Sequence, residues 1–417
     1  MNPSSGRATD ASDRVRHAYI LVIIAFALIA ASVTIYEINF PNFLREQYNV
    51  GEWFRGFLEF PRELQGFAVV FYVVALGGLS ERRLFSIAAI LSAVGLIGLA
   101  ILTPRSLPDD LSGVLPGLPM IVMLTIHSAG FHLAGTMQRC IILDHGDLAS
   151  AGMRLGKVGF WTTLSGLTAA GAVWGLRHVL PVDYRFFFWF AAGLCGAAVL
   201  VMWFAMRGLQ QVRPEKRRFV LKRKFTRYYA LCALFGVRKQ VFVTFALWVL
   251  VTVYDQPVET IALLWVVTLI TNLVTQPGIG WLIDRFGPRW ILTIDALCLV
   301  VVCLLYGYSE QLFLERKIAL MVIGLVYVCD HVLFFVGAAR SVYAGAIADD
   351  SQELATTVSL GVTIDHVFSM SVPILGGLIW KLFGYEYVFL AAGGVALLTA
   401  ITAYGIPQSI TASRHGQ

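Results

Sequence analysis

Long apolar runs, separated by short polar segments, dominate the pattern of this chain. A helix needs about 20 apolar residues to cross the hydrocarbon core of a bilayer, and by that rule the chain holds about twelve such runs. The runs are continuous and do not alternate between apolar and polar positions, which favours helices over a membrane β-barrel. The sequence therefore predicts an all-α polytopic membrane protein with twelve transmembrane helices.

The predicted spans are separated by turns rich in glycine, proline and charged residues, and they follow one another closely along the chain. The polar N-terminal tail, residues 1–17, is expected to be cytoplasmic and to lack regular structure, and it carries no signal-peptide cleavage pattern. Residues 408–417 form a second cytoplasmic tail. The spans are expected at residues 18–40, 52–79, 84–102, 118–142, 155–176, 184–206, 228–254, 258–283, 290–308, 318–346, 356–383 and 387–406.

Composition agrees with this pattern and excludes several classes of protein. Of the 417 residues, 58% are hydrophobic and only 14% are charged, which lies outside the range of soluble globular proteins. The 6 cysteines lie in apolar runs without a CxxC pair, so we interpret them as packing residues. No phosphate-binding GxxxxGK[ST] loop, HExxH helix or Ser-His-Asp arrangement stands out. We therefore expect neither an enzyme nor a cofactor or metal site.

The net charge of +6 is concentrated in one central segment, residues 207–227, which includes RPEKRRFVLKRKFTR. This segment divides the chain into residues 18–206 and 228–407. Basic residues favour the cytoplasmic side of a membrane, so the segment and both termini are predicted to be cytoplasmic. The segment is expected to contact anionic lipids and not nucleic acid. The cytoplasmic membrane of a bacterium is the expected location.

The two parts of the chain resemble each other at an offset of about 200 residues, the kind of repeat that reveals architecture. The turn GGLSERRLF (77–85) corresponds to GIGWLIDRFGPRW (278–290), and VDYRFFFWFAAG (182–193) corresponds to FGYEYVFLAAGG (383–394). Arg139, at the end of the fourth span, corresponds to Arg340 in the tenth. Three matches in the same order predict two pseudo-symmetric six-helix bundles, the parallel-repeat plan of many transporters.

With these features, the sequence resembles the major facilitator superfamily of transporters over residues 17–407. Its most specific element, GWLIDRFGPR from Gly280 to Arg289, is similar to the family's cytoplasmic GxLxDRxGRR turn. The resemblance implies close helix packing at Gly280 and a gating latch made by Asp284, Arg285 and Arg289. We group the repeat-related Arg139 and Arg340 with these gating residues. In the first repeat, Ser80 or Glu81 stands where the aspartate would be.

The second predicted span begins with a charged stretch, GEWFRGFLEFPRELQGF (51–67). Arg55, Glu59, Arg62 and Glu63 share one face of a helix by their spacing. Glu59 would lie roughly 12 Å into the membrane at 1.5 Å per residue, while Glu37, near the end of the first span, is expected close to the far interface. A charge at the depth of Glu59 indicates either ion pairs between helices or a substrate or proton site.

Other charged groups interrupt later spans. Arg238, Lys239 and Gln240 lie in the seventh span, and we expect them deep in the membrane. The alternative is a surface amphipathic helix over 222–235 with a short span that starts at Arg238. The remaining candidates are paired or single groups at mid-span, namely Asp330, His331, Asp365, His366 and His127. The spacing of His127 and His132 does not place both on one face, which argues against a metal pair.

The resemblance implies that the first, fourth, seventh and tenth spans line a central cavity, which His127, Arg238, Lys239 and Asp330 would face. Adjacent cations suit a carboxylate or phosphate solute, but they could equally neutralise Glu59 and Glu63 across the bundle interface. His331 and His366 each stand beside an aspartate. They could carry a coupling proton or only form hydrogen bonds between helices.

These features predict a secondary active transporter that moves a small polar or anionic solute by alternating access. Protons or another ion are the expected coupling partner, and the protein is expected to be a monomer. Two alternatives remain open. One is a multidrug or metabolite proton antiporter of the same fold, and the other is a non-transporting membrane receptor or assembly factor.

Overall fold

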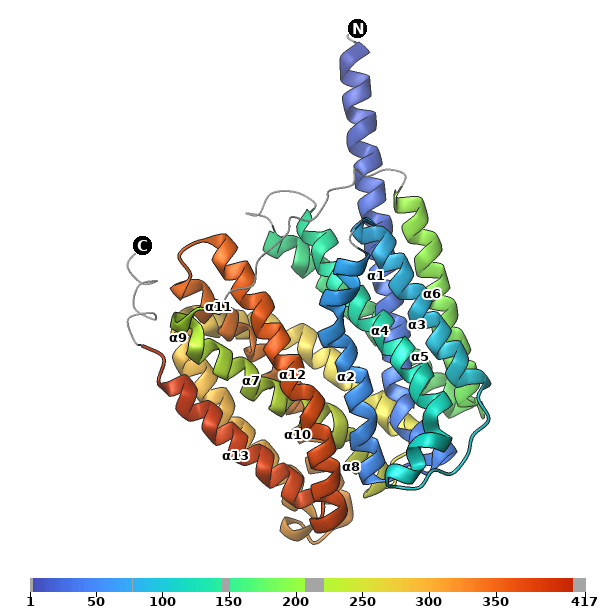
Figure 1. The fold of residues 1–417 in the computed structure, drawn as a ribbon, viewed down its shortest axis with the longest axis vertical. Helices are drawn as coiled ribbons and strands as arrows, with labels where there is room; N and C mark the ends of the chain where they lie inside the picture. The colour runs from blue at the N-terminus through green and yellow to red at the C-terminus, as the bar shows by residue number, and fades with distance from the viewer. Residues whose placement is uncertain (1–2, 77, 145–150, 207–220, 408–417) are drawn as a thin grey trace.

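The computed structural model describes residues 3–76, 78–144, 151–206 and 221–407, and within them the regular structure is entirely helical (Figure 1). The all-α prediction is confirmed. Nine stretches of the described residues are long and apolar enough to cross a membrane, and the longest contains two helices. The twelve-span count stays a prediction, because the charged helix α2 (Glu52–Ala75) and α5 (Ala151–Val179) are not among the nine.

The first bundle packs α1 against α5 and α6, α3 against α4 and α6, and α2 against α4. Its core is formed by apolar residues from all of these helices. The helices of the first bundle besides α2 and α5 are α1 (Pro3–Tyr48), α3 (Glu81–Ile101), the 3-10 turn η1 (Leu111–Gly113), α4 (Val114–Asp144) and α6 (Tyr184–Met206).

The second bundle packs α9 against α10 and α13, and α7 against α12 and α13. A π-helical turn, η4, joins α7 to α8, so the predicted seventh span is one continuous helical stretch. The elements of the second bundle are the 3-10 turn η3 (Arg223–Phe225), α7 (Thr226–Val241), η4 (Phe242–Ala246), α8 (Leu247–Thr252), α9 (Val258–Leu312), α10 (Arg316–Val336), α11 (Ala338–Ile347), α12 (Ser351–Phe383) and α13 (Tyr385–Tyr404).

Two glycines mark breaks in the helices of the second bundle. One break lies in a predicted turn, and the other lies inside a single predicted span. Gly287 has φ 76° and ψ 164°, a backbone conformation open essentially only to glycine, and it separates the two helices of α9. This kink falls in the turn predicted between spans 258–283 and 290–308. Gly337 separates α10 from α11, which together cover the predicted span at 318–346. The domain boundaries drawn from the sequence stay a prediction.

The N-terminal tail was expected to lack structure, and this expectation is wrong. Helix α1 begins at Pro3 and extends without interruption into the apolar span. Once a helix is nucleated, each further residue adds a hydrogen bond, and proline is well suited to the first helical turn. Most of the basic segment at 207–227, and the tail at 408–417, lie outside the described residues.

The two bundles meet through α2 and α12, α5 and α9, and α1 and α8. In Figure 1 the α2 and α12 ribbons approach each other at the end opposite the N-terminus and diverge toward the end that carries the termini. A Cβ atom on Gly56 would lie 2.1 Å from the Pro373 carbonyl oxygen, so this crossing requires glycine. The Asn42 amide also donates to the Gln256 carbonyl across the bundles at 2.9 Å.

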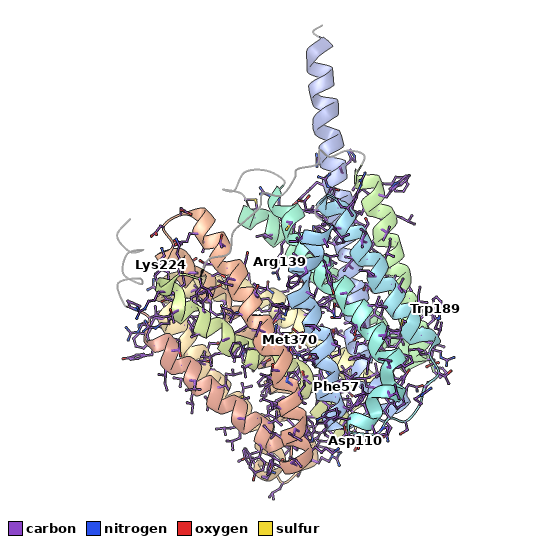
Figure 2. The ribbon with its side chains drawn as sticks, in the orientation of Figure 1. Phe57, Asp110, Arg139, Trp189, Lys224 and Met370 are labelled. Carbon is purple, nitrogen blue, oxygen red and sulfur yellow. The ribbon has the colours of Figure 1, made fainter. Side chains whose placement is uncertain are left out.

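Charged side chains mark both ends of the molecule. Figure 2 shows Asp110 at the end where the bundles meet, and Arg139 and Lys224 at the end that carries the termini. Beside Asp110, the Lys381 ammonium lies 3.3 Å from the Asp109 carboxylate and links α12 to the loop before α4. The bundles are thus held together at one end by the close crossing of α2 and α12 and by polar contacts.

Replacing Gly287 with alanine is expected to destabilise the protein by about 1–3 kcal/mol, because alanine is strained in this backbone conformation. Thermal unfolding of the purified protein in detergent measures the change. Gly280→Ala is the matched control, since a Cβ atom there meets nothing within 4 Å. Equal melting temperatures for the two variants would contradict the assignment of strain to Gly287.

Candidate functional site

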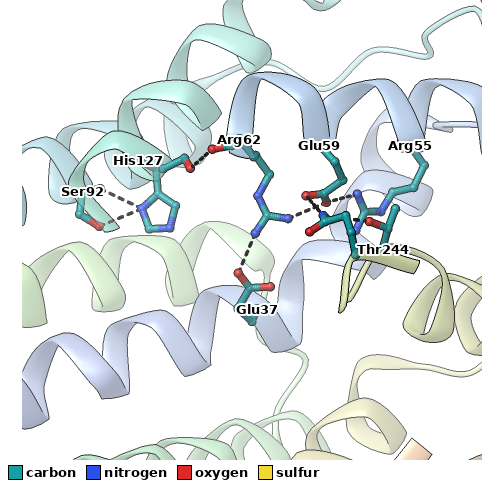
Figure 3. A network of polar contacts seen from close by, with 9 residues as sticks. Glu37, Arg55, Glu59, Arg62, Ser92, His127 and Thr244 are labelled. Carbon is teal, nitrogen blue, oxygen red and sulfur yellow. Dashed lines mark hydrogen bonds and ion pairs between the residues drawn. The ribbon is translucent and has the colours of Figure 1, made fainter. Parts of the chain in front are cut away.

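A network of buried charges lies on one face of α2 (Figure 3). The Arg62 guanidinium donates to Glu59 at 2.7 Å and to Glu37 of α1 at 2.8 Å. Arg55 also donates to Glu59, whose other oxygen accepts from the Gln240 amide of α7 at 3.1 Å. We call Glu37, Arg55, Glu59, Arg62 and Gln240 the α2 network. Its two arginines and two glutamates sum to no net charge.

The surroundings of the α2 network compensate for burial of its charges. Glu59 is 0% exposed and Arg55 is 2% exposed. The guanidinium of Arg55 lies over the Phe40 and Trp248 rings at 5.7 and 5.9 Å, where cation–π attraction stabilises it. A buried charge is tolerated only when it is paired and hydrogen-bonded. This geometry matches the ion-pair interpretation of the charged stretch, and its Glu59–Gln240 contact joins the two bundles.

A second group of charges lies between the bundles. The Lys239 ammonium lies 3.1 Å from the Asp365 carboxylate and 3.9 Å from that of Glu63. The Glu63 carboxylate also accepts from Nδ1 of His366 at 3.0 Å, and the His132 ring stacks edge-on against His366 at 5.2 Å. We call Glu63, Lys239, Asp365, His366 and His132 the interface cluster. It draws on α2, α4, α7 and α12, and therefore on both bundles.

The interface cluster differs from the α2 network in its net charge. With both histidines neutral, its two carboxylates and one ammonium sum to −1, so a single bound proton makes it neutral. The side chains of Glu63, Lys239, Asp365 and His366 are between 12% and 16% exposed. A Cβ atom on Gly66 would lie 2.6 Å from the His366 ring, so glycine permits this approach of α12 to α2. The cluster thus carries one charge without a partner, whereas the charges of the α2 network sum to zero.

Arg238 pairs within the second bundle and not across the interface. Its guanidinium donates to the Asp330 carboxylate of α10 at 2.9 Å, and both residues are 5% exposed. Within the part of the chain that the structure describes, Nε and Nη1 of Arg238 and one oxygen of Asp295 are buried without a hydrogen-bond partner. The burial of Arg238 and Gln240 in a continuous helical stretch agrees with the deep-membrane interpretation of this segment.

Two of the predicted histidines lie away from the interface cluster. Nδ1 of His127 lies 2.9 Å from the Ser92 hydroxyl of α3, and its ring packs on Tyr36 at 4.3 Å. The structure thus places His127 inside the first bundle instead of facing the second. Nδ1 of His331 donates to the Tyr327 carbonyl at 3.0 Å, a bond within its own helix. The participation of His127 and His331 in the site stays a prediction.

His132, Glu37 and Asp295 are not among the site residues expected from the sequence. Glu37 was expected near the interface because the first span was ended at residue 40, but α1 continues to Tyr48 and so places Glu37 deeper. Asp295 is the one acidic residue in the apolar run from 290 to 308, a signal that could have identified it. His132 belongs to the cluster because its ring packs against that of His366 on α12. The spacing of residues along α4 does not reveal this contact between two helices.

The predicted gating residues lie toward the end that carries the termini. Arg285 lies over the Trp281 ring at 5.8 Å, Arg289 over Tyr404 at 4.3 Å and Arg340 over Phe235 at 3.4 Å. Asp284 and Arg139 are exposed. A Cβ atom on Gly280 would meet nothing within 4 Å, so the close packing implied by the resemblance is not found at this glycine. The bundles diverge here, and the gating role of these residues stays a prediction.

Comparison with known proteins places the fold. No protein-family model matches the chain, and no curated protein sequence matches it. Solved structures do match. A variant of the nucleoside transporter NupG is 14% identical with a TM-score of 0.72, covering 93% of this chain and 99% of that one. A D-xylose–proton symporter is 15% identical (TM-score 0.63, covering 93% and 97%), and the human organic anion transporter MFSD10 is 13% identical (TM-score 0.62, covering 93% and 99%).

These matches span nearly the whole of each chain, and all are to membrane transporters. The protein therefore has the fold of the major facilitator superfamily transporters, as its sequence predicts. At these sequence identities the likeness establishes the fold alone.

Replacing Arg238 with methionine is expected to destabilise the protein by about 3–5 kcal/mol, because it leaves the buried Asp330 carboxylate without its cation. The double variant Arg238→Met, Asp330→Leu removes both charges and should recover most of that loss. Denaturant unfolding in detergent measures both values. A single variant as stable as the parent would contradict the pairing.

Proposed function

We propose that this protein is a secondary active transporter that moves a small polar or anionic solute across a membrane by alternating access, with coupling to protons. The observation that carries the proposal is the interface cluster. Ionisable side chains are rare inside membrane spans and usually mark substrate or ion pathways. Here they come from both bundles and meet where the bundles must separate for the solute to pass.

The cluster offers a physical route for coupling. Lys239 contacts carboxylates on α2 and α12, and an ammonium attracts an ionised carboxylate more strongly than a protonated one. A proton on Glu63 or Asp365 therefore weakens the contact of Lys239 with that helix. The Glu63 contact joins the two bundles, whereas the Asp365 contact lies within the second bundle. A proton on Glu63 therefore shifts the balance between two arrangements of the bundles. Solute binding to one arrangement would shift the same balance.

Among the described residues, polar contacts cross between the bundles at the interface cluster, at the Glu59–Gln240 bond of the α2 network and at the end away from the termini. With the basic segment and both termini placed in the cytoplasm, the end at which α2 and α12 cross would face away from the cytoplasm. The proposal includes a bacterial cytoplasmic membrane, a monomer and anionic lipids at the basic segment. The drug or metabolite antiporter alternative would use the same cluster in the opposite direction, whereas a receptor or assembly factor would give no flux.

The proposal predicts a pH-dependent flux that requires Glu63. In proteoliposomes, Glu63→Gln is expected to lower solute flux at least about tenfold and to flatten its dependence on pH, because the variant cannot exchange a proton at this position. Flux is measured by mass spectrometry of the trapped solutes, and proton movement by a dye enclosed in the vesicles. Wild-type flux and pH dependence in Glu63→Gln would contradict the role of the cluster.

Glu353→Gln is the matched control. Glu353 lies in the first turn of α12 and accepts from Lys222 and Lys224, each at 2.6 Å. Hydrogen bonds from these lysines lower the pKa of Glu353 to about 2. Because the pKa is lowered, this ion pair is present at neutral pH and is lost only as the pH falls toward 2. Glu353→Gln should therefore leave the pH dependence of flux near neutrality unchanged.

A further inference from the structure

A cavity of about 320 Å³ lies between α1, α4 and α5 of the first bundle and α9 of the second. Its size falls within the range of small-molecule sites. None of the residues of the interface cluster or of the α2 network lines it. The cavity is therefore separate from the coupling charges, although the two bundles both contribute to its wall.

The polar groups of the cavity are hydroxyls and one amide, from Thr34, Gln138, Thr162 and Thr163. The Thr34 hydroxyl donates to the Ala30 carbonyl at 3.0 Å, and that of Thr162 to the Val158 carbonyl at 3.0 Å. Both oxygens can still accept a hydrogen bond. Among the described residues the Gln138 amide has no hydrogen-bond partner in the protein, so it can donate to and accept from a bound molecule.

The rest of the wall is apolar, with Ile29, Val33, Phe131 and Leu269 among its residues, and no charged side chain lines the cavity. An ionised carboxylate or phosphate held there would lack a cation, which is costly in surroundings of low polarity. The cations that could otherwise receive it, Lys239 and Arg238, are paired with carboxylates.

From this lining we infer that the cavity is the solute site of the transporter proposed above, and that it takes a neutral solute with an apolar face and several hydrogen-bonding groups. The inference rests on the proposed function and narrows its solute class from polar or anionic to neutral. The charges of the interface cluster then serve coupling and not recognition.

The chain offers a way to fill the cavity without disturbing the fold. Phe131, Gly135 and Gln138 share one face of α4 by their spacing and all line the cavity. A Cβ atom on Gly135 would meet nothing within 4 Å. A leucine at this position would therefore extend into the cavity. Gly193→Leu is the matched control, because Gly193 is an exposed glycine of α6 with equally open space.

The experiment supplies proteoliposomes with matched pairs of solutes that differ in charge, namely phenyl glucoside with phenyl glucuronide and a nucleoside with its monophosphate. Uptake is measured by mass spectrometry for the wild type, Gly135→Leu and Gly193→Leu. We expect uptake of a neutral member over its anionic partner, a loss of at least about tenfold in Gly135→Leu and wild-type uptake in Gly193→Leu.

If Gly135→Leu takes up a neutral member as well as the wild type does, the cavity is not the solute site, while the transporter proposal stands. Uptake of anionic members alone would overturn the solute class. If the wild type takes up none of them, the proposed function fails for these solutes. Thermal stabilisation of the purified protein by the same panel then tests whether the cavity binds a neutral solute. Stabilisation by a neutral member that is lost in Gly135→Leu supports the site, and its absence from the wild type, or its persistence in Gly135→Leu, overturns it.

Discussion

The pairing of ionisable groups inside apolar helices is the constraint on which this structure depends. A charged side chain cannot face lipid at mid-span, and its partner has to come from another helix or from the next helical turn. Glu37 thus ties α1 to α2, Gln240 ties α7 to α2, and Asp330 ties α10 to α7. The positions of these charges specify which helices must be neighbours, which apolar packing alone specifies weakly.

The paired charges divide into two kinds with different consequences. The α2 network is neutral in sum and packed against aromatic rings, so its removal should mainly affect stability. The interface cluster is partly exposed and changes its net charge with one proton. Helix α4 connects the cluster to the cavity, because it carries His132 toward α12 and lines the cavity with Phe131, Gly135 and Gln138. The Ser128 hydroxyl of α4 also donates to the Arg62 carbonyl of α2 at 2.7 Å, which ties α4 to the helix that carries Glu63.

The sequence was sufficient to predict the fold class, since long apolar runs, a repeated turn and a basic central segment are each visible in one dimension. The sequence also identified Glu59, Glu63, Lys239 and His366 as candidate site residues, because an ionisable residue within an apolar run is visible in the sequence itself. It could not give their partners, which come from helices far apart in the chain, as Glu63 and His366 do. The depth of Glu37 was misjudged because a span estimated from hydropathy stops where polar residues begin, while α1 continues through Pro41. The cavity left no signal, since glycine, threonine and phenylalanine are ordinary residues of membrane helices.

The central claim is that charges from both bundles are energetically coupled at the interface cluster. A double-mutant cycle on Glu63→Gln and Lys239→Gln, read from the free energy of unfolding in detergent, tests it most directly. The account predicts that the two substitutions are not additive and that their interaction energy is at least about 1 kcal/mol, in the range of neighbouring groups in one network. Additive effects would show that the two charges do not interact, and would contradict the account.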